Sequence, residues 1–281
     1  MVWESFLNPE EEQQRVEVTS SITNRLLRYG IAAKKGYDME VKALEALFSG
    51  LPLTEDLKKG FEAMRIFIPR VSGEIKNRHD AVKNEINSAG LDNLVVGACG
   101  LSPVGMVFAS AHPNARVYDT DLGDIIDYRN SLRIETPENY QTTKWDLLSG
   151  EVPDFAGDLK GKTGMVVEGL IFYLDDSQKA ELNKTLQKAA RLMSPNKPVT
   201  FVFDCYVADK PAKERDTLPM TDHPKWEYFR SLVSNVHEGQ KPSFNVRDDV
   251  RDYLESAGYK NVELSSVTRN GNAHTIWRCE F

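Results

Sequence analysis

Acidic side chains that follow a glycine turn are the residues of this sequence best placed to bind a ligand. The turn contains Gly97 and Gly100, which let the chain bend tightly and a ligand approach the backbone. It follows the apolar run Leu94–Val96, typical of a buried strand, and precedes a helix with Pro103 in its first turn. A second strand ends on Asp119, 19 residues after Gly100, where a carboxylate can hold the two hydroxyls of a ribose. This pattern predicts a nucleoside-containing cofactor at one edge of a parallel sheet.

Three classes of nucleotide site are compatible with such a turn. A P-loop has Gly-Lys-Ser/Thr after its last glycine, but here Gly161-Lys162-Thr163 precedes a strand and indicates only a solvated turn. A dinucleotide site stays open, although Gly97-x-x-Gly100 does not give the full GxGxxG pattern. The third class is the S-adenosylmethionine (SAM) site of a class I methyltransferase. That class expects an acid after the second and third strands, a residue at the end of the fourth, and a terminal β-hairpin.

The sequence offers a candidate for each of these four features. Asp119 and Asp121 end the second predicted strand, Asp146 follows the third, and Glu168 ends the fourth. Asn270-Gly271 lies between two β-rich runs and is a strong hairpin signal. A dinucleotide fold does not predict that hairpin, so the pattern favours SAM as the cofactor.

Alternating strands and helices from residue 91 onward must position these acids. They predict an α/β fold: a doubly wound, seven-stranded, Rossmann-like methyltransferase sheet with five parallel strands and a terminal hairpin whose last strand runs antiparallel. Residues 1–90 are expected to form a helical N-terminal cap or lid, 91–281 the SAM-binding domain, and 205–246 a substrate-specificity insertion. The expected strands are 94–96, 116–118, 140–144, 165–167, 199–206, 261–265 and 274–279, and the expected helices around them are 74–89, 122–133, 176–193, 226–236 and 247–257.

Composition argues against several other classes of protein. The 281 residues carry a formal net charge of −7 and no basic block, which argues against nucleic acid as a partner. The three cysteines, Cys99, Cys205 and Cys279, lie far apart, so we expect no disulfide framework and a reducing compartment. The sequence contains neither a CxxC nor an HxxxH spacing, so we expect no structural zinc site. With neither a signal-peptide pattern nor an apolar run long enough for a membrane span, we expect a cytoplasmic enzyme that acts on a small molecule.

Four segments match the motifs of one known family. They are Val95–Gly105 (VVGACGLSPVG), Val117–Arg129 (VYDTDLGDIIDYR), Trp145-Asp146-Leu147 and Glu168–Leu174 (EGLIFYL). Together they resemble the leucine carboxyl methyltransferase family. Within it, they are most similar to the bacterial branch that acts on small molecules and polyketides. The resemblance covers about residues 78–206, and the Glu-Gly-Leu-x-x-Tyr-Leu element is its most specific part. It implies a seven-stranded class I fold, a helical lid, SAM as cofactor, and a place in secondary metabolism.

The resemblance also implies cofactor contacts for individual residues. They are Ala98, Cys99 and Gly100 at the methionine part, Asp119 or Asp121 at the ribose, Asp146 and Leu147 at the adenine, and Glu168 at the methionine amino group. An arginine of the lid helix would bind the cofactor carboxylate, with Arg70 and Arg78 as candidates. Simpler roles stay open, because the acids after the second strand could cap the next helix, Asp146 could be a turn residue, and Tyr173 could pack in the core.

Methyl transfer is an in-line displacement that the enzyme promotes by positioning the acceptor and excluding water. A carboxylate acceptor needs no base because it is already ionised, whereas a phenol or alcohol needs one within reach. The candidates for such a catalytic role are Tyr173 after the fourth strand, Asp204 and Tyr206 at the end of the fifth, and His223, Tyr228 and His237 after it.

The predicted function is SAM-dependent methylation of an oxygen, carboxylate or hydroxyl, on a small molecule. The same fold can use the sulfonium otherwise, by cyclising or transferring the aminobutyryl chain and releasing methylthioadenosine. A non-catalytic SAM-binding subunit and an NAD-linked oxidoreductase are the remaining alternatives. Within the glycine turn, Gly100 is expected to lie against the cofactor, and Gly97 to matter mainly for folding.

Overall fold

The computed structural model describes residues 78–100, 102–131, 136–207, 244–269 and 273–281. The chain divides into two compact units, and all of these residues belong to the unit formed by Glu74–Lys213 and Lys241–Phe281. The other unit, Met1–Gly73 with Glu214–Gln240, lies outside the described residues, and so do the predicted helix 226–236 and most of the predicted cap and insertion.

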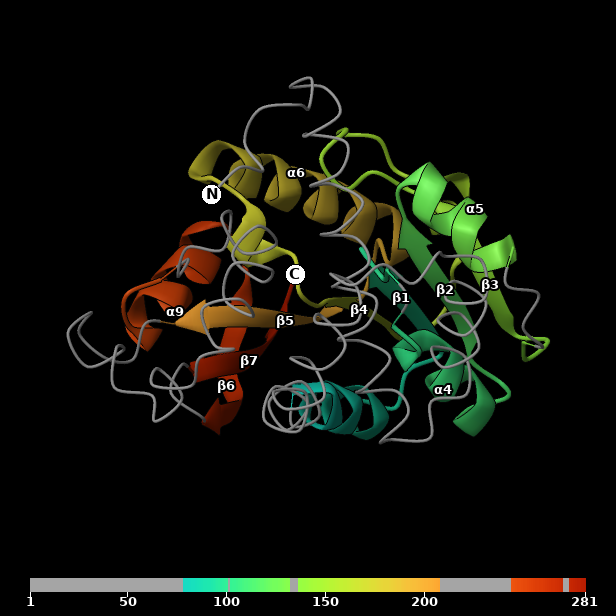
Figure 1. Ribbon diagram of the computed structural model, residues 1–281, viewed down its shortest axis with the longest axis horizontal. Helices are drawn as coiled ribbons and strands as arrows, with labels where there is room; N and C mark the ends of the chain where they lie inside the picture. Colours follow the sequence, from blue (N-terminus) through green and yellow to red (C-terminus); the bar gives the residue numbers. More distant parts are fainter. Residues whose placement is uncertain (1–77, 101, 132–135, 208–243, 270–272) are drawn as a thin grey trace, which may run out of the picture. The chain divides into compact units, whose positions relative to one another are not determined.

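A seven-stranded sheet forms the centre of the described unit, in the order β3-β2-β1-β4-β5-β7-β6 (Figure 1). β1 to β5 are parallel, and β7 runs antiparallel to both β5 and β6. This arrangement confirms the predicted Rossmann-like methyltransferase sheet, including the terminal hairpin with its reversed last strand. The strands are β1 (Asn93–Gly97), β2 (Arg116–Asp121), β3 (Tyr140–Lys144), β4 (Thr163–Val167), β5 (Thr200–Val207), β6 (Lys260–Arg269) and β7 (Ala273–Glu280).

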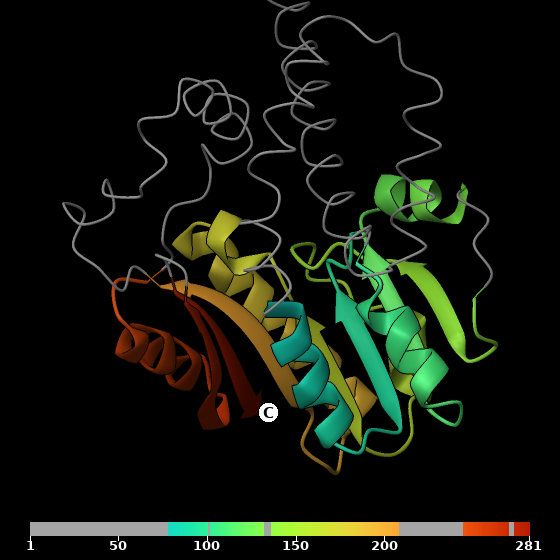
Figure 2. The same cartoon turned by 60° about the horizontal axis from the view of Figure 1, so that its bottom comes forward.

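Helices cover both faces of the sheet, as a parallel sheet with two apolar faces requires (Figures 1 and 2). Helix α6 begins at a capping box, in which the Asp175 carboxylate accepts from the Gln178 N–H and the Gln178 side chain accepts from the Asp175 N–H. The α-helices are residues 78–88, α4 (Val104–Ala111), α5 (Gly123–Ser131), α6 (Asp176–Met193) and α9 (Arg247–Ser256), with short 3-10 turns at Asp154–Asp158 and Ile171–Tyr173.

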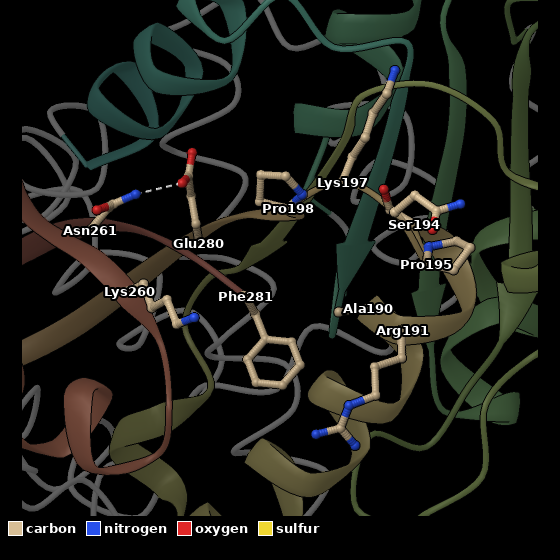
Figure 3. A pocket seen from close by; sticks show the side chains of 11 residues that line it. Ala190, Arg191, Ser194, Pro195, Lys197, Pro198, Lys260, Asn261, Glu280 and Phe281 are labelled. Atoms are coloured by element: carbon tan, nitrogen blue, oxygen red, sulfur yellow. Dashed lines mark hydrogen bonds between the residues drawn. The ribbon is translucent and has the colours of Figure 1, made fainter.

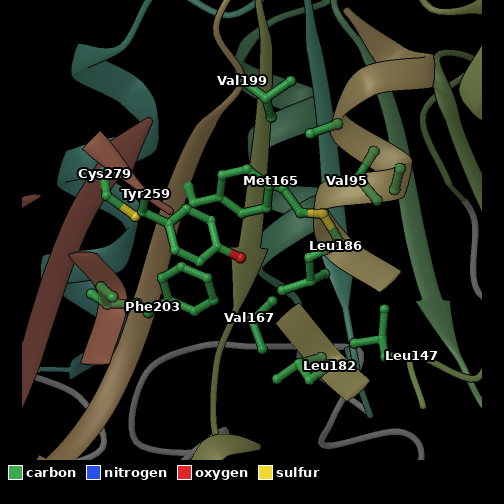
Figure 4. Close-up of a cluster of buried hydrophobic side chains, with 14 of the residues drawn as sticks. Val95, Leu147, Met165, Val167, Leu182, Leu186, Val199, Phe203, Tyr259 and Cys279 are labelled. Carbon is green, nitrogen blue, oxygen red and sulfur yellow. The ribbon is translucent and has the colours of Figure 1, made fainter. Parts of the chain in front are cut away.

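The core consists of two clusters, one on each face of the sheet. Side chains of a strand alternate between faces, so Val95 packs in the first cluster, whereas Leu94 and Val96 pack in the second. The first cluster joins the strands to α6 and α9 and includes Phe203 (Figure 4). The ring of Phe203 stacks on that of Phe201. The second joins them to α4, α5 and the helix of residues 78–88.

The helix of residues 78–88 belongs to the α/β unit, although we expected it within the N-terminal cap. Val82 and Ile86 are buried in the second core cluster with strand residues of the sheet. Gly90, at φ +60°, follows its end in the left-handed conformation that glycine adopts readily. The described part of this helix therefore packs in the core of the α/β unit and carries Arg78.

Candidate cofactor site

Four of the predicted site residues lie in one row along an edge of the sheet. The strand order reverses at β1, which lies between β2 and β4, and open α/β sheets bind ligands beyond the carboxyl ends of their strands at such a point. Gly97 is level with Thr120 and Val167, and Val167 is in turn level with Phe203. The residues that come next along these four strands therefore form one row: Ala98, Asp121, Glu168 and Asp204.

A cluster of charges occupies the β4–β5 part of this row. The Arg78 Nε atom donates to Glu168 Oε1 at 2.8 Å, and Arg78 Nη1 lies 3.3 Å from Asp204 Oδ2. His79 Nδ1 lies 3.3 Å from Glu168 Oε2. The helix of residues 78–88 thus brings a cation and a histidine to two carboxylates, one directly after β4 and one within β5.

The cluster holds Arg78 and Glu168 in their charged forms. Burial alone would lower the pKa of Arg78, but the charges of Asp204 and Glu168 outweigh it and raise that pKa. Burial alone would raise the pKa of Glu168, but His79 and Arg78 outweigh it and hold the pKa of this carboxyl well below its usual range. The site therefore presents an anion and a cation side by side, which is the complement of an amino-acid zwitterion.

The glycine turn is bent back onto the end of β2. Ala98 and Gly100 have φ values of +51° and +53°, so two residues of the turn are left-handed, a conformation that costs a residue with a side chain more than it costs glycine. The Gly100 N–H donates to Asp121 Oδ2 at 2.6 Å, and the Leu122 N–H donates to Asp121 Oδ1 at 2.7 Å. Asp121 thus caps the turn and the chain beyond β2, while its side chain stays partly exposed.

Asp119 does not lie at the surface, which corrects the prediction that it could hold a ribose. Its side chain is 0 % exposed and its Oδ2 atom accepts from Arg129 Nη2 at 2.6 Å and from the Tyr140 hydroxyl at 2.7 Å. The carboxylate faces α4, because a Cβ placed on Gly105 would lie 1.8 Å from Asp119 Oδ1. Of the two predicted ribose ligands, Asp121 is the one whose position suits that role.

Other predicted cofactor residues differ in what they offer a ligand. Asp146 is exposed after β3 and accepts from the Leu148 N–H at 2.8 Å, so it makes the expected turn and remains open to a ligand. Leu147 and Cys99 are buried in the two core clusters, so their side chains stabilise the fold and only their backbones could contact an adenine or a methionine. Ala98 is half-buried.

The predicted catalytic residues are only partly covered by the structure. Tyr173, at the end of the 3-10 turn after β4, is 46 % exposed, so it does not pack in the core. Asp204 is fully buried beside Arg78, where it neutralises the guanidinium rather than facing outward as a base would. Arg70, His223, Tyr228 and His237 lie outside the described residues, as does the side chain of Tyr206.

Two residues that matter to the site were not singled out by sequence reasoning. His79 contacts Glu168, and Arg129 contacts the backbone of the glycine turn, where its Nη1 donates to the Gly100 carbonyl at 2.9 Å. Neither has a local motif of its own. The position of His79 directly after Arg78 was the only available signal, and Arg129 lies 29 residues from the turn it contacts.

A hollow of about 560 Å³ lies at the opposite edge of the sheet (Figure 3). It is bordered by the end of α6, the segment that leads to β5, the beginning of β6 and the end of β7, and Asn261 donates to Glu280 at 2.6 Å on its rim. None of the predicted site residues lines it. Among the described residues, no group of His, Cys, Asp or Glu could hold a metal ion, and no described helix is long and apolar enough to cross a membrane.

No protein-family model matches the sequence, and no curated protein does. Solved structures do share the fold. A candidate exported protein from Bordetella parapertussis is 13% identical, with a TM-score of 0.57 over 98% of this chain and 99% of its own. The SAM-dependent methyltransferase SibL in its apo form is 13% identical, with a TM-score of 0.52 over 92% of this chain and 73% of its own.

A candidate O-methyltransferase from Nostoc punctiforme is also 13% identical, with a TM-score of 0.51 over 92% of this chain and 72% of its own. The chain spans only 57% of the length of another match, PigF, solved with S-adenosylhomocysteine (SAH). At these identities the likeness establishes the fold alone. The chain has the seven-stranded, Rossmann-like fold found in SAM-dependent methyltransferases.

Proposed function

We propose that the protein is a SAM-dependent methyltransferase. One observation carries the proposal: Arg78 and Glu168 form an ion pair with a 2.8 Å contact, in the same row as the glycine turn and Asp121. Neighbouring strands are about 4.8 Å apart, so the backbones at Asp121 and Glu168, which flank β1, are separated by roughly 10 Å. A ribose at one end and an amino-acid zwitterion at the other are the two polar parts of SAM.

The charges of the cluster fit the methionine end of this cofactor. The α-ammonium would bind the Glu168 carboxylate, and the α-carboxylate would bind the guanidinium of Arg78. Asp204 and His79 would hold these two groups in place from behind. Asp121 would accept hydrogen bonds from the ribose hydroxyls, and Asp146 would border the adenine. A nicotinamide dinucleotide has no amino-acid end, so it would leave the ion pair without a ligand.

SAM bound in this way would supply an electrophilic methyl group, and the chain would supply orientation and exclusion of water. We propose that the acceptor is an oxygen, carboxylate or hydroxyl, of a small molecule. The resemblance to leucine carboxyl methyltransferases supports this choice, as do the Gly-Leu-Ser-Pro turn and the Glu-Gly-Leu-x-x-Tyr-Leu element. The name of the Nostoc protein agrees with it. Tyr173, exposed beside the cluster, is the described residue best placed to face an acceptor.

Calorimetric titration with SAH tests the proposal directly. The wild-type protein should bind SAH, whereas Glu168→Gln and Arg78→Met should each weaken binding about 10- to 100-fold, because a charge-assisted hydrogen bond contributes roughly 1.5–3 kcal/mol. Glu255→Gln, an exposed change on α9, serves as the matched control and should bind as the wild type does. Absence of SAH binding by a folded wild-type protein would refute the proposal.

Mass spectrometry of the cofactor product then tests the chemistry. The protein is incubated with SAM, with and without candidate acids and phenols. SAH as the product supports methyl transfer, and its formation only with an added acid or phenol supports an oxygen acceptor. Methylthioadenosine as the product would instead show cyclisation or transfer of the aminobutyryl chain.

A further inference from the structure

A buried arginine lies directly beneath the glycine turn. Arg129, on α5, is 4 % exposed and donates to two carbonyl oxygens of the turn: Nη1 to Gly100 at 2.9 Å and Nη2 to Ser102 at 3.0 Å. The Gly100 carbonyl belongs to the segment of residues 98–100 that the resemblance places at the methionine part of SAM, and the Ser102 carbonyl follows it closely. Few side chains can do this, because only a guanidinium offers several donors in one rigid plane.

Two neighbours hold the guanidinium in place. Asp119 Oδ2 accepts from Nη2 at 2.6 Å, and the Tyr140 hydroxyl accepts from Nε at 3.0 Å. The same hydroxyl donates to Asp119 Oδ2 at 2.7 Å, which closes a ring of three side chains from β2, β3 and α5. Burial alone would lower the pKa of Arg129, but the charge of Asp119 outweighs it and raises that pKa, so the group stays protonated.

We infer that Arg129 is a positioning residue, which fixes the glycine turn in its ligand-binding shape while Asp119 and Tyr140 orient it. The inference rests on the proposed function for the identity of the ligand. The turn needs such a support because Ala98 and Gly100 are both left-handed, and only one of them is glycine. A buried charge is costly unless it is fully hydrogen-bonded, and here four acceptors on three strands or turns satisfy one guanidinium.

Arg129→Lys tests this inference, since lysine can keep the ion pair with Asp119 but cannot reach both carbonyls of the turn. We expect SAH affinity to fall at least tenfold and amide hydrogen exchange to rise in the peptide that spans Gly100 and Ser102. The exchange measurement separates a local role from a general loss of stability, which would speed exchange throughout the sheet. A folded variant with unchanged SAH affinity, or with weaker binding but unchanged exchange in this peptide, overturns the inference.

Tyr140→Phe provides a second variant if the lysine change prevents folding. It removes one hydroxyl from the ring around Arg129, and we expect SAH affinity to fall several-fold. Tyr253→Phe is the matched control, since it removes a hydroxyl that accepts from Asn183 Nδ2 at 2.9 Å, away from the turn, and should leave SAH affinity unchanged. Equal affinities for these two phenylalanine variants would contradict the inference. If the wild type does not bind SAH, the proposed function fails, while the exchange measurement still decides whether Arg129 fixes the turn.

Discussion

Replacing Gly105 with alanine tests whether Asp119 faces α4. The test is whether the free energy of unfolding falls or rises. Gly105 lies in the first turn of α4, where alanine would ordinarily stabilise the protein by about 0.5–1 kcal/mol. The added Cβ, however, would lie 1.8 Å from Asp119 Oδ1 and 2.7 Å from its Cγ. Because real atoms do not approach so closely, either α4 or the carboxylate must move.

The expected loss follows from what holds the carboxylate. Asp119 is bound to Arg129 at 2.6 Å and to Tyr140 at 2.7 Å, so displacing it breaks a buried ion pair, which costs about 3–5 kcal/mol. After the gain from alanine, the net loss is about 2–4 kcal/mol. For a chain of this size, that corresponds to a fall in melting temperature on the order of 3–7 °C.

Thermal melts of the purified variants measure this effect. Gly157→Ala is the matched control, because a Cβ there would meet nothing within 4 Å, and its melting temperature should stay near that of the wild type. In an Asp119→Ala background, the Gly105→Ala change should no longer destabilise, since its neighbour has been removed. A Gly105→Ala melting temperature equal to or above the wild-type value would show that Asp119 does not face α4 as described.

Three further predictions concern the site and the thiols. Glu168→Gln should destabilise the protein at pH 7, and its difference from the wild type in denaturant titrations should shrink as the pH falls below about 4.5. The folded-state pKa is depressed, so the stabilising effect is complete above the unfolded pKa and is lost as the pH falls towards the folded one. Gly100→Ala should weaken SAH binding in calorimetry by roughly 5- to 30-fold, because φ is +53° there and the left-handed conformation costs alanine about 1–2 kcal/mol. Gly97→Ala, whose Cβ would lie 3.0 Å from Leu147, should lower the melting temperature with little effect on affinity; the reverse pattern would contradict this assignment. A thiol-reactive chromogenic reagent should modify the three cysteines only after unfolding, because burial raises the pKa of each thiol; fast reaction in the folded protein would count against it. The three are Cys99, Cys205 and Cys279.

Local sequence patterns were sufficient to predict most of the sheet and its helices. Apolar runs such as Leu94–Val96 identify strands that are buried on both faces, and the expected helix 176–193 agrees with α6. The run 261–279 with Asn270-Gly271 predicts the pairing of β6 with β7. These features depend on residues close together in the chain, so their spacing alone carries the information.

The sequence could not determine which aspartate of β2 stays uncovered at the edge of the sheet. Asp119 and Asp121 are two residues apart and so lie on the same face of the strand. The position of α4 against that strand decides the difference between them. The helix covers Asp119, with Gly105 packed against its carboxylate, whereas Asp121 lies beyond the end of the helix. No pattern along the chain specifies where that helix begins relative to the end of a neighbouring strand.

The charge cluster and the support of the glycine turn depend on tertiary structure for a related reason. Glu168 is 90 residues from Arg78, and Arg129 is 29 residues from Gly100. The sequence determined that charged residues lie at the ends of the strands of a Rossmann-like sheet. Strand order, register and helix packing alone decided which of them pair with one another and which remain at the surface, because electrostatic contacts form between neighbours in space and not between neighbours in sequence.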